Sequence, residues 1–209
     1  MRVLIACEFS GTVREAFRAR GHDAWSVDLL PSERPGPHLI ENISESKRLC
    51  FTPGSHRRWD LIIAHPPCRY LCNSGIRWLY NGGKLSGGRD EERWRLMGEA
   101  AEFFRICMDA PCPRMAVENS RPHKYAEPIM GEPSQVIHPW QFGVPETKET
   151  WLWLKGLPPL NPTSIVPKHL RRNSVHRASP GPERWMERSR TFQGIADAMA
   201  EQWGSSPCP

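Results

Sequence analysis

"RVLIACEFSGTVREAFRARG", residues 2–21, places a short apolar run directly before a segment with the character of a helix. The run RVLIAC is typical of a buried strand, and the next residues allow a helix that Ser10 or Thr12 could cap and Gly21 would end. The inner stripe of this helix is expected to hold Val13, Ala16, Phe17 and Arg20. A strand that leads into a helix is the repeating unit of a parallel sheet, so this stretch predicts an α/β protein.

The same alternation continues along the chain. Strands are predicted over residues 23–29, 59–64 and 114–118, and a long amphipathic helix over 94–108. That helix has its apolar stripe at Trp94, Met97, Ala101, Phe104 and Met108. Two further strands are predicted within QVIHPWQFG and KETWLWLKG, and the second has its tryptophans and leucines on opposite faces. A last helix is predicted over residues 191–203. The expected fold is α/β with a mostly parallel sheet and helices on both faces.

Length and composition favour a single domain over residues 1–209. Within it, residues 156–190 form a basic, proline-rich segment with weak periodicity, and residues 205–209 are expected to be a disordered tail. No window approaches the 18 or more apolar residues of a membrane span, and the N-terminus lacks the apolar region of a signal peptide. We therefore expect a cytoplasmic protein with no membrane partner, and a monomer is favoured.

The chain has seven cysteines, an odd number in a protein large enough to need no disulfide framework. Reduced thiols are expected. Cys68 and Cys72 have a tolerable spacing for a metal, with His65 nearby, but no second pair of ligands accompanies them, so no metal is predicted.

The formal net charge is +5, and the stretch from Lys168 to Arg190 alone carries five more basic than acidic residues. Two interpretations remain open for this stretch. It is either an ordinary solvated surface or a strip that faces the phosphates of a nucleic acid.

Polar and reactive residues follow four of the predicted strands at the points where they end. EFSG (8–11) follows the first strand, Asp28 the second, PPC (66–68) the third, and EN (118–119) the fourth. The carboxyl ends of parallel strands lie at one edge of the sheet, which is where ligands bind in such folds. Each of these residues alone has an ordinary explanation as a turn or cap.

Their order along the chain resembles that of the cytosine-C5 DNA methyltransferase family, in a compact form of the kind found in phage and prophage genomes. EFSG resembles the family's first, cofactor-binding motif, HPPC (65–68) the nucleophile motif, VEN (117–119) the glutamate motif, and FGVPETKET (142–150) a motif that reads roughly FGxPQxRxR. The resemblance spans most of residues 2–155 and, less closely, the last helix. It implies a Rossmann-like, S-adenosylmethionine-dependent methyltransferase fold.

The resemblance also implies roles for individual residues. Cys68 would add to C6 of a cytosine flipped out of the DNA, Glu118 would hold N3 and the exocyclic amine of that base, and Lys148 would donate to its O2. The S-adenosylmethionine pocket would comprise Glu8, Phe9, Ser10, Gly11, Asp28, Asn42 and Pro66, with Phe9 stacked on adenine and Asp28 bound to the ribose hydroxyls. The expected contacts to DNA are Pro67, Asn119, Lys168, Arg171, Arg172, Arg177, Arg188 and Arg190.

The chain departs from the family pattern at several points. Only one glycine remains in GTVR (11–14), Asn42 stands where an aspartate is common, and Glu146, Lys148 and Thr150 replace Gln, Arg and Arg. About forty residues stand where relatives carry a target-recognition domain, which predicts low or short sequence specificity. The loop 81–92 could be a lid or a plain surface loop.

Three functions are consistent with these residues. The first is a DNA cytosine-C5 methyltransferase. The second is a pyrimidine-C5 transferase that acts on RNA or a free nucleotide, with methyl or another group transferred. The third is a non-catalytic relative that binds nucleic acid.

Overall fold

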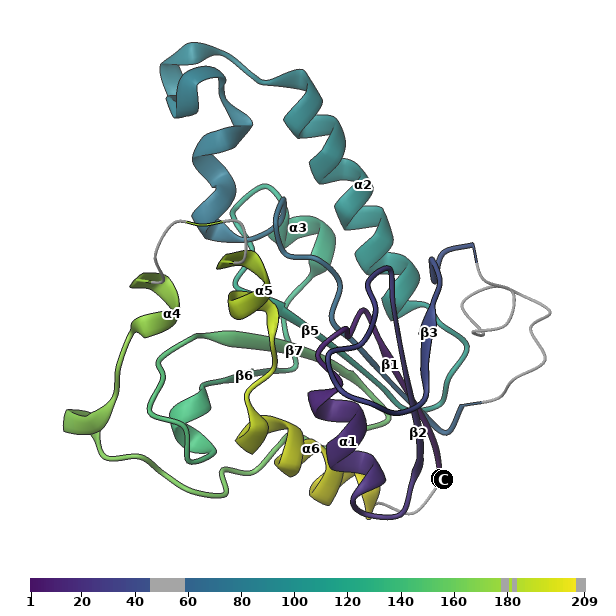
Figure 1. The fold of residues 1–209 in the computed structure, drawn as a ribbon. Coiled ribbons are helices and arrows are strands. Elements are labelled where there is room, and N and C mark those ends of the chain that lie inside the picture. Colours follow the sequence, from purple (N-terminus) through teal and green to yellow (C-terminus); the bar gives the residue numbers. More distant parts are fainter. Residues whose placement is uncertain (46–58, 178–180, 182–183, 206–209) are drawn as a thin grey trace.

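The computed structural model describes residues 1–45, 59–177, 181 and 184–205, and it is built around one seven-stranded sheet (Figure 1). Across the sheet the strands run in the order β3-β2-β1-β4-β5-β7-β6. The strands are β1 Arg2–Ala6, β2 Asp23–Asp28, β3 His38–Ile40, β4 Leu61–Ala64, β5 Met115–Ser120, β6 Gln135–Ile137 and β7 Thr150–Lys155.

The sheet is parallel from β3 through β5, and β7 is antiparallel to both of its neighbours. The chain builds outward from β1 through β2 to β3, and then returns to the other side of β1 with β4. This reversal makes a topological switch point between β1 and β4. In open α/β sheets, ligands bind at such a point, next to the carboxyl ends of the strands.

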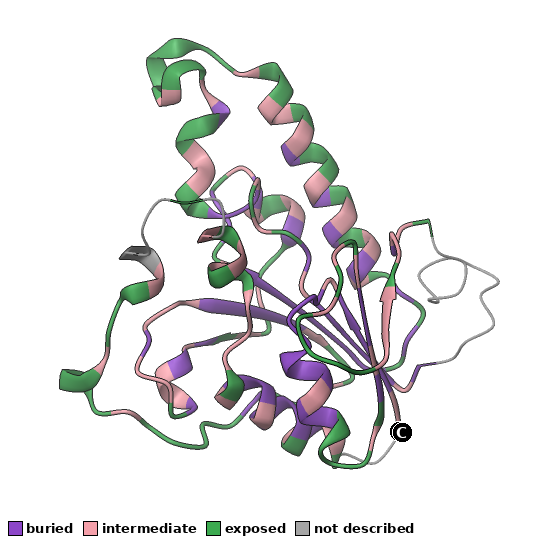
Figure 2. Cartoon of the chain, in the orientation of Figure 1, coloured by how far each residue is buried: buried purple, intermediate pink, exposed green. Residues whose placement is uncertain are grey.

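Helices cover both faces of the sheet, as predicted. α1 Thr12–Arg18 and α6 Gln193–Gly204 pack together on one face, and α2 Glu91–Met108 packs on the other. The two apolar layers are separated by a sheet whose central strands are fully buried (Figure 2). The Rossmann-like α/β fold that we expected is confirmed.

The alternation of side chains on β7 agrees with its sequence pattern. Trp151 and Trp153 belong to the apolar layer under α2, whereas Leu152 lies in the layer under α6. The stripe of α1 was predicted one turn too long. Arg20 is exposed, because the helix ends at Arg18 before the turn that Arg20 would need.

The edge strand β3 was missed because its three residues are too few for an apolar alternation to be recognised. The remaining helices are short: α3 Glu127–Met130, α4 Ser174–Arg177 and α5 Arg184–Ser189. Short 3₁₀ turns occupy residues 73–79, 81–83, 85–87, 139–141 and 168–170.

The first turn of α2 and the loop before it project away from the sheet (Figure 1). Within this loop the Asn81 amide donates to the carbonyls of Gly87 and Arg89, so residues 81–89 close on themselves. Within the described parts of the chain, no helix is both long and apolar enough to cross a membrane.

The basic segment that follows β7 lies along the FGVPETKET loop. Phe142 pairs with Ser164 and Glu146 with Arg172 in isolated bridges. The buried Glu146 carboxylate also accepts hydrogen bonds from the backbone N–H and the hydroxyl of Ser174. These bridges and hydrogen bonds therefore attach the basic segment to the FGVPETKET loop. Of the predicted tail, residues 206–209 lie outside the described residues.

Candidate active site

Four polar side chains form a row across the carboxyl ends of adjacent strands. Ala6 of β1 is in register with Val27 of β2 and Ala64 of β4, and Ala64 is in register with Val117 of β5. The residues that follow these four are Cys7, Asp28, His65 and Glu118. The carboxyl ends of these four strands therefore bring together titratable groups that lie far apart in sequence, from Cys7 to Glu118.

His65 and Glu118 form a buried pair at the centre of this row. His65 Nδ1 lies 2.8 Å from Glu118 Oε2, and the two side chains are 8% and 11% exposed. Burial alone would raise the pKa of Glu118, but the charge of Lys148 and the hydrogen bond from His65 hold that pKa below its ordinary value. Glu118 is therefore a carboxylate that accepts the Nδ1–H of His65. The sequence pattern suggested only a possible metal-ligand role for His65 and did not predict its bond to Glu118.

Cys68 and Cys72 lie together on one helical turn after β4. The N–H groups of Leu71 and Cys72 both donate to the Cys68 carbonyl, which brings the two thiols into hydrogen-bond contact. That contact, with help from the Ser74 hydroxyl at 3.1 Å, lowers the pKa of Cys72 to about 5 against the effect of burial. The same contact and burial raise the pKa of Cys68. The contact between the two thiols thus favours the ionised form of Cys72 and the protonated form of Cys68.

Positive groups surround this pair. The charge of Lys148 acts on Cys68 as well as on Glu118, and that of Arg188 acts on Cys72. The Lys148 ammonium donates to the Arg188 carbonyl at 3.2 Å, so α5 lies against the loop that precedes β7. The predicted catalytic residues Cys68, Glu118 and Lys148 are thus brought together.

The two prolines before Cys68 differ in environment. Pro66 is buried and Pro67 is exposed. The Asn119 amide donates to the Pro66 carbonyl at 2.9 Å, which ties the nucleophile loop to the end of β5. Asn119 is only 2% exposed, so in this structure it supports the loop and does not face solvent where DNA would lie.

Glu8 is turned toward α1 and away from the sheet edge. Its carboxylate accepts the N–H of Val13 at 2.6 Å and that of Arg14 at 3.2 Å, and it is 4% exposed. Burial raises its pKa, in opposition to His65 and to these two hydrogen bonds. Ser10 Oγ accepts the N–H of Thr12 at 3.3 Å, so the bond expected from Ser10 is present, and Glu8, a residue predicted to bind cofactor, accepts the next two N–H groups of α1.

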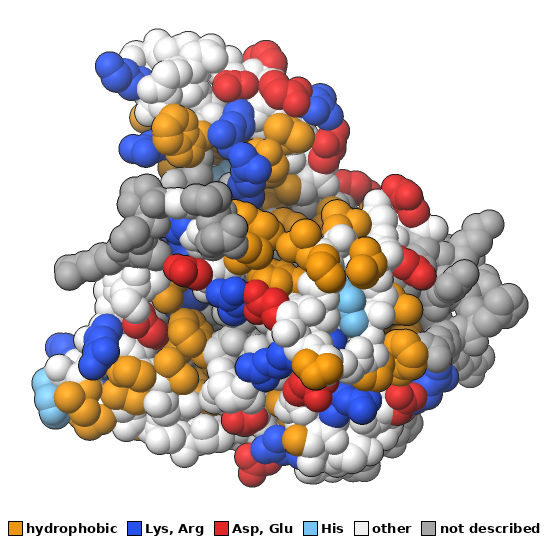
Figure 3. Space-filling model, viewed as in Figure 1, with side chains coloured by type: hydrophobic (Ala, Val, Ile, Leu, Met, Phe, Trp, Pro, Cys, Tyr) orange, Lys and Arg blue, Asp and Glu red, His pale blue; other side chains and the backbone are white. Residues whose placement is uncertain are grey.

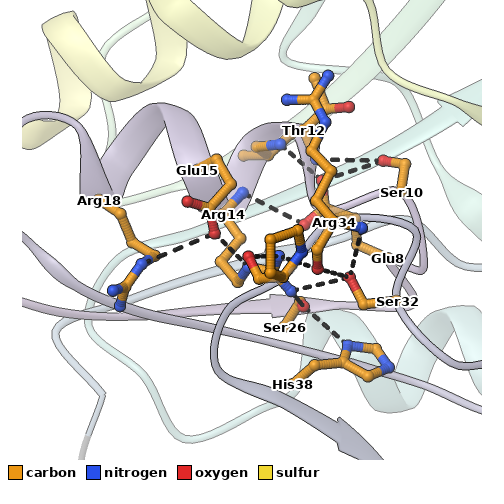
Figure 4. A network of polar contacts seen from close by, with 12 residues as sticks. Glu8, Ser10, Thr12, Arg14, Glu15, Arg18, Ser26, Ser32, Arg34 and His38 are labelled. Carbon is orange, nitrogen blue, oxygen red and sulfur yellow. Dashed lines mark hydrogen bonds and ion pairs between the residues drawn. The ribbon is translucent and has the colours of Figure 1, made fainter.

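Arg14 is fully buried, although its place on α1 suggested an ordinary surface charge. Its guanidinium donates to the hydroxyls of Ser26 and Ser32 and to the carbonyls of Arg34 and Pro35 (Figure 4). These bonds order the turn after β2. Gly11, at φ +68°, is needed here, because a Cβ at that position would lie 2.7 Å from the Arg14 guanidinium. Neither Arg14 nor this use of Gly11 was expected from the sequence.

A small hollow lies over the end of β1. It measures about 40 Å³ and is lined by Cys7, Glu8, Phe9, Ser10, His65, Ser189, Arg190 and Thr191. Arg190 covers the hollow and forms a bidentate ion pair with Glu33, with Nη2–Oε1 at 2.5 Å and Nε–Oε2 at 2.9 Å. The Phe9 ring lines the hollow, and it contacts Trp185 with ring centroids 6.0 Å apart. Of the residues predicted to bind cofactor, Glu8, Phe9 and Ser10 line the hollow directly.

Two other predicted cofactor residues are occupied by local bonds. Asp28 lies at the end of β2, half-buried, and accepts the N–H of Leu30 at 3.0 Å; burial raises its pKa. The Asn42 side-chain oxygen accepts both the N–H and the hydroxyl of Ser44, so it caps a turn.

The predicted DNA contacts do not share one environment. Lys168 and Arg172 are exposed, whereas Arg171 lies over the Trp140 ring at 3.5 Å. Arg188 is half-buried beside the thiols and Arg190 is paired as described; the side chain of Arg177 lies outside the described residues. On the face shown in Figure 3, basic side chains are dispersed among acidic and apolar ones.

A larger hollow of about 390 Å³ lies between the FGVPETKET loop and the basic segment. Gly143 and Pro145 line it on one side and residues 164–172 on the other. No three His, Cys, Asp or Glu side chains of the described residues gather into a metal-binding group.

No protein-family model matches the chain, and no curated protein sequence matches it. Among solved structures, it is similar to a protein described as a DNA modification methyltransferase encoded within an E. coli prophage, with 16% identity and a TM-score of 0.49. That similarity covers 80% of this chain and 52% of the other.

The Dnmt2 methyltransferase of S. pombe is also similar, with 13% identity and a TM-score of 0.40, over 76% of this chain and 50% of that one. A mutant of Spodoptera frugiperda DNMT2 gives 13% identity and a TM-score of 0.41, over 79% and 54%. The chain thus spans about half the length of these structures.

Proposed function

We propose that this chain is an S-adenosylmethionine-dependent DNA cytosine-C5 methyltransferase. The observation that carries the proposal is the convergence of a thiol pair, a buried carboxylate and an ammonium at the carboxyl ends of β4, β5 and the start of β7. A nucleophile, an acid–base group and a cation in contact are what addition of sulfur to a pyrimidine ring requires.

The reaction begins when the Cys68 sulfur adds to C6 of the flipped cytosine. The Glu118 carboxylate accepts a hydrogen bond from the exocyclic amine, and the negative charge that reaches N3 is neutralised by a proton that Glu118 first takes up from solvent and then passes to N3, with Lys148 nearby to offset negative charge. S-adenosylmethionine supplies the methyl group, which C5 of the ring takes up as a nucleophile. Loss of the proton from C5 then restores the double bond and expels the Cys68 thiolate.

Cys72 has a part in this scheme that the sequence did not suggest. Cys68 carries its proton when Cys72 is the thiolate. Because the two sulfur atoms are in hydrogen-bond contact, we propose that this proton passes to Cys72 as the Cys68 sulfur adds to C6, when the negative charge moves into the ring. A weak thiol nucleophile is commonly activated by such an adjacent base.

The hollow over β1 fits the cofactor in chemistry but not in volume. Its lining has an aromatic ring in Phe9, a hydroxyl in Ser10 and, in His65, a buried ring nitrogen with no partner among the described residues. About 40 Å³ is little more than the share of one water molecule, whereas small-molecule sites occupy roughly 300–1,000 Å³. Cofactor binding therefore requires residues 189–191 to move outward, which breaks the Arg190–Glu33 pair.

DNA is the proposed substrate, because exposed Lys168 and Arg172 give phosphate contacts, and Arg188 connects the same segment to the thiols. The segment between β7 and α6 has short turns and no sheet or long helix of its own in its described part. Such a segment can bind a backbone but offers few side chains to base edges, so specificity should be low or confined to a short site.

The experiment is to trap the covalent intermediate. DNA that contains 5-fluorocytosine should form a stable adduct with the wild-type protein when S-adenosylmethionine is present, because fluorine cannot leave C5 as a proton does. Peptide mass spectrometry should place the adduct on Cys68. Cys68→Ala should form none, and Cys72→Ala should form the Cys68 adduct more slowly. An adduct on Cys72, or no adduct with any DNA tested, would overturn the proposal.

A further inference from the structure

One ring nitrogen in the site has no assigned role. The His65 side chain is 8% exposed, and its Nδ1 is used in the bond to Glu118. Its Nε2 is also buried, yet it has no hydrogen-bond partner among the described residues. Buried polar atoms without partners are rare in folded proteins, and at a ligand site each one points to a group that the ligand supplies.

The two nitrogens of His65 face different parts of the site. Nδ1 faces Glu118, on the side where the target base must lie. The ring also lines the small hollow together with Phe9 and Ser10, which is the side assigned to the cofactor. A single imidazole therefore lies between the base side and the cofactor side.

The charges around this ring favour a cationic ligand group. The carboxylates of Glu118, Glu8 and Asp28 all act electrostatically with His65, from β5, from the end of β1 and from β2. The cation that lines the hollow, Arg190, is paired with Glu33, and Lys148 lies on the Glu118 side. With its Nδ1–H donated to Glu118, a neutral imidazole presents the lone pair of Nε2 and can only accept a hydrogen bond.

We propose that His65 is a positioning residue with two contacts: Nε2 accepts a hydrogen bond from the α-ammonium of the S-adenosylmethionine methionine moiety, while Nδ1–H orients Glu118. The inference rests on the proposed function and names a contact that neither the motif resemblance nor the structural neighbours supply. Its consequence is that one side chain sets the relative placement of the methyl donor and of the carboxylate that activates the base.

Two amide substitutions separate the two contacts. In His65→Asn the amide can stand where Nδ1 stands, so it retains a donor to Glu118 but is too short to reach the hollow. In His65→Gln the longer amide can stand where Nε2 stands and gives up the bond to Glu118. His169→Asn, on an exposed turn remote from the hollow, is the matched control.

Binding of S-adenosylhomocysteine to the DNA-free protein, measured by calorimetry, is the first readout. We expect His65→Asn to weaken binding by about 10–100-fold, the range for a hydrogen bond to a charged group. His65→Gln should bind within about threefold of wild type yet show a lower kcat, and the control should be unchanged in both. Equal affinity of wild type and His65→Asn, with both folded by circular dichroism, would overturn the inference.

The second readout needs no variant. An analogue of S-adenosylhomocysteine that lacks the amino group should bind the wild-type protein about 10–100-fold more weakly than S-adenosylhomocysteine itself. Equal binding of the two compounds would overturn the inference while leaving the proposed function intact. Failure of the wild-type protein to bind either compound would instead contradict the proposed function.

Discussion

Replacement of Arg14 by methionine tests whether the buried guanidinium network holds the cofactor side of the site in place. Methionine retains most of the apolar stem but removes every donor. Arg14 donates to Ser26 at 2.8 Å, to Ser32 at 3.0 Å, and to the carbonyls of Arg34 and Pro35 at 2.8 and 3.1 Å. Its substitution leaves these acceptors in place without their partner.

The expected magnitude follows from these bonds. The Ser26 hydroxyl keeps its bond to His38, the Ser32 hydroxyl keeps its bond to the Arg34 carbonyl, and the exposed residues Arg34 and Pro35 can bond to water instead. We therefore expect a loss of about 1.5–3 kcal/mol, the value of one hydrogen bond to a charged group. For a protein of this size, each kcal/mol shifts the midpoint of thermal unfolding by about 2–4 °C, so a fall of roughly 3–12 °C is expected. The turn that Arg14 holds carries Glu33, the partner of Arg190, so the ion pair that closes the hollow should weaken as well.

The assay is urea unfolding followed by far-ultraviolet circular dichroism, with Arg18→Met as the control. Arg18 lies on the same helix, its side chain is 38% exposed, and its one ion pair, with Glu15, spans 3.7 Å. The control should change the free energy of unfolding by less than about 0.5 kcal/mol, as surface substitutions do. If Arg14→Met stayed within about 1 kcal/mol of wild type, the network would not be what orders the turn.

Three further predictions concern the chemistry and its partners. Glu118→Gln should slow single-turnover methyl transfer by about 10²–10⁴-fold with little change in DNA affinity, measured by rapid quench; weakened DNA binding at an unchanged rate would contradict its role. The pKa of Glu118 is lowered in the folded protein, so its carboxylate contributes stability at pH values above the ordinary glutamate pKa. This contribution is lost as the pH falls through the lowered pKa, so the stability of Glu118→Gln should fall less steeply with acid than that of the wild type. Lys168→Ala with Arg172→Ala should flatten the slope of log affinity against log salt by about two units on duplex DNA, and an unchanged slope would remove both from the interface. Burial raises the pKa of Cys107 to about 12, so iodoacetamide at about pH 7 should leave this thiol unmodified in the native protein, and labelling of it as fast as the Cys68–Cys72 pair would refute its burial.

Local pattern in the sequence determined most of the architecture. The apolar runs and helical stripes predicted six of the seven strands, all except β3, together with α1, α2 and α6. Parallel pairing followed from the alternation, and the carboxyl ends of parallel strands converge whatever the loops do. That is why Cys68 and Glu118, which follow predicted strands, lie together in the structure. Lys148, whose role came from the motif resemblance, acts electrostatically on both.

Tertiary structure alone decided how the polar side chains pair. The sequence shows that Glu8 follows a strand, but only the folded chain shows its carboxylate on the N-terminus of α1. Likewise, Arg14 has the pattern of a surface residue, and only the return of the turn at residues 32–36 buries it. The bond between His65 and Glu118 joins groups 53 residues apart. A hydrogen bond depends on distance and direction in space, and periodicity along the chain does not encode either. Once the paired side chains are buried, each hydrogen bond strongly affects their charge states and pKa values.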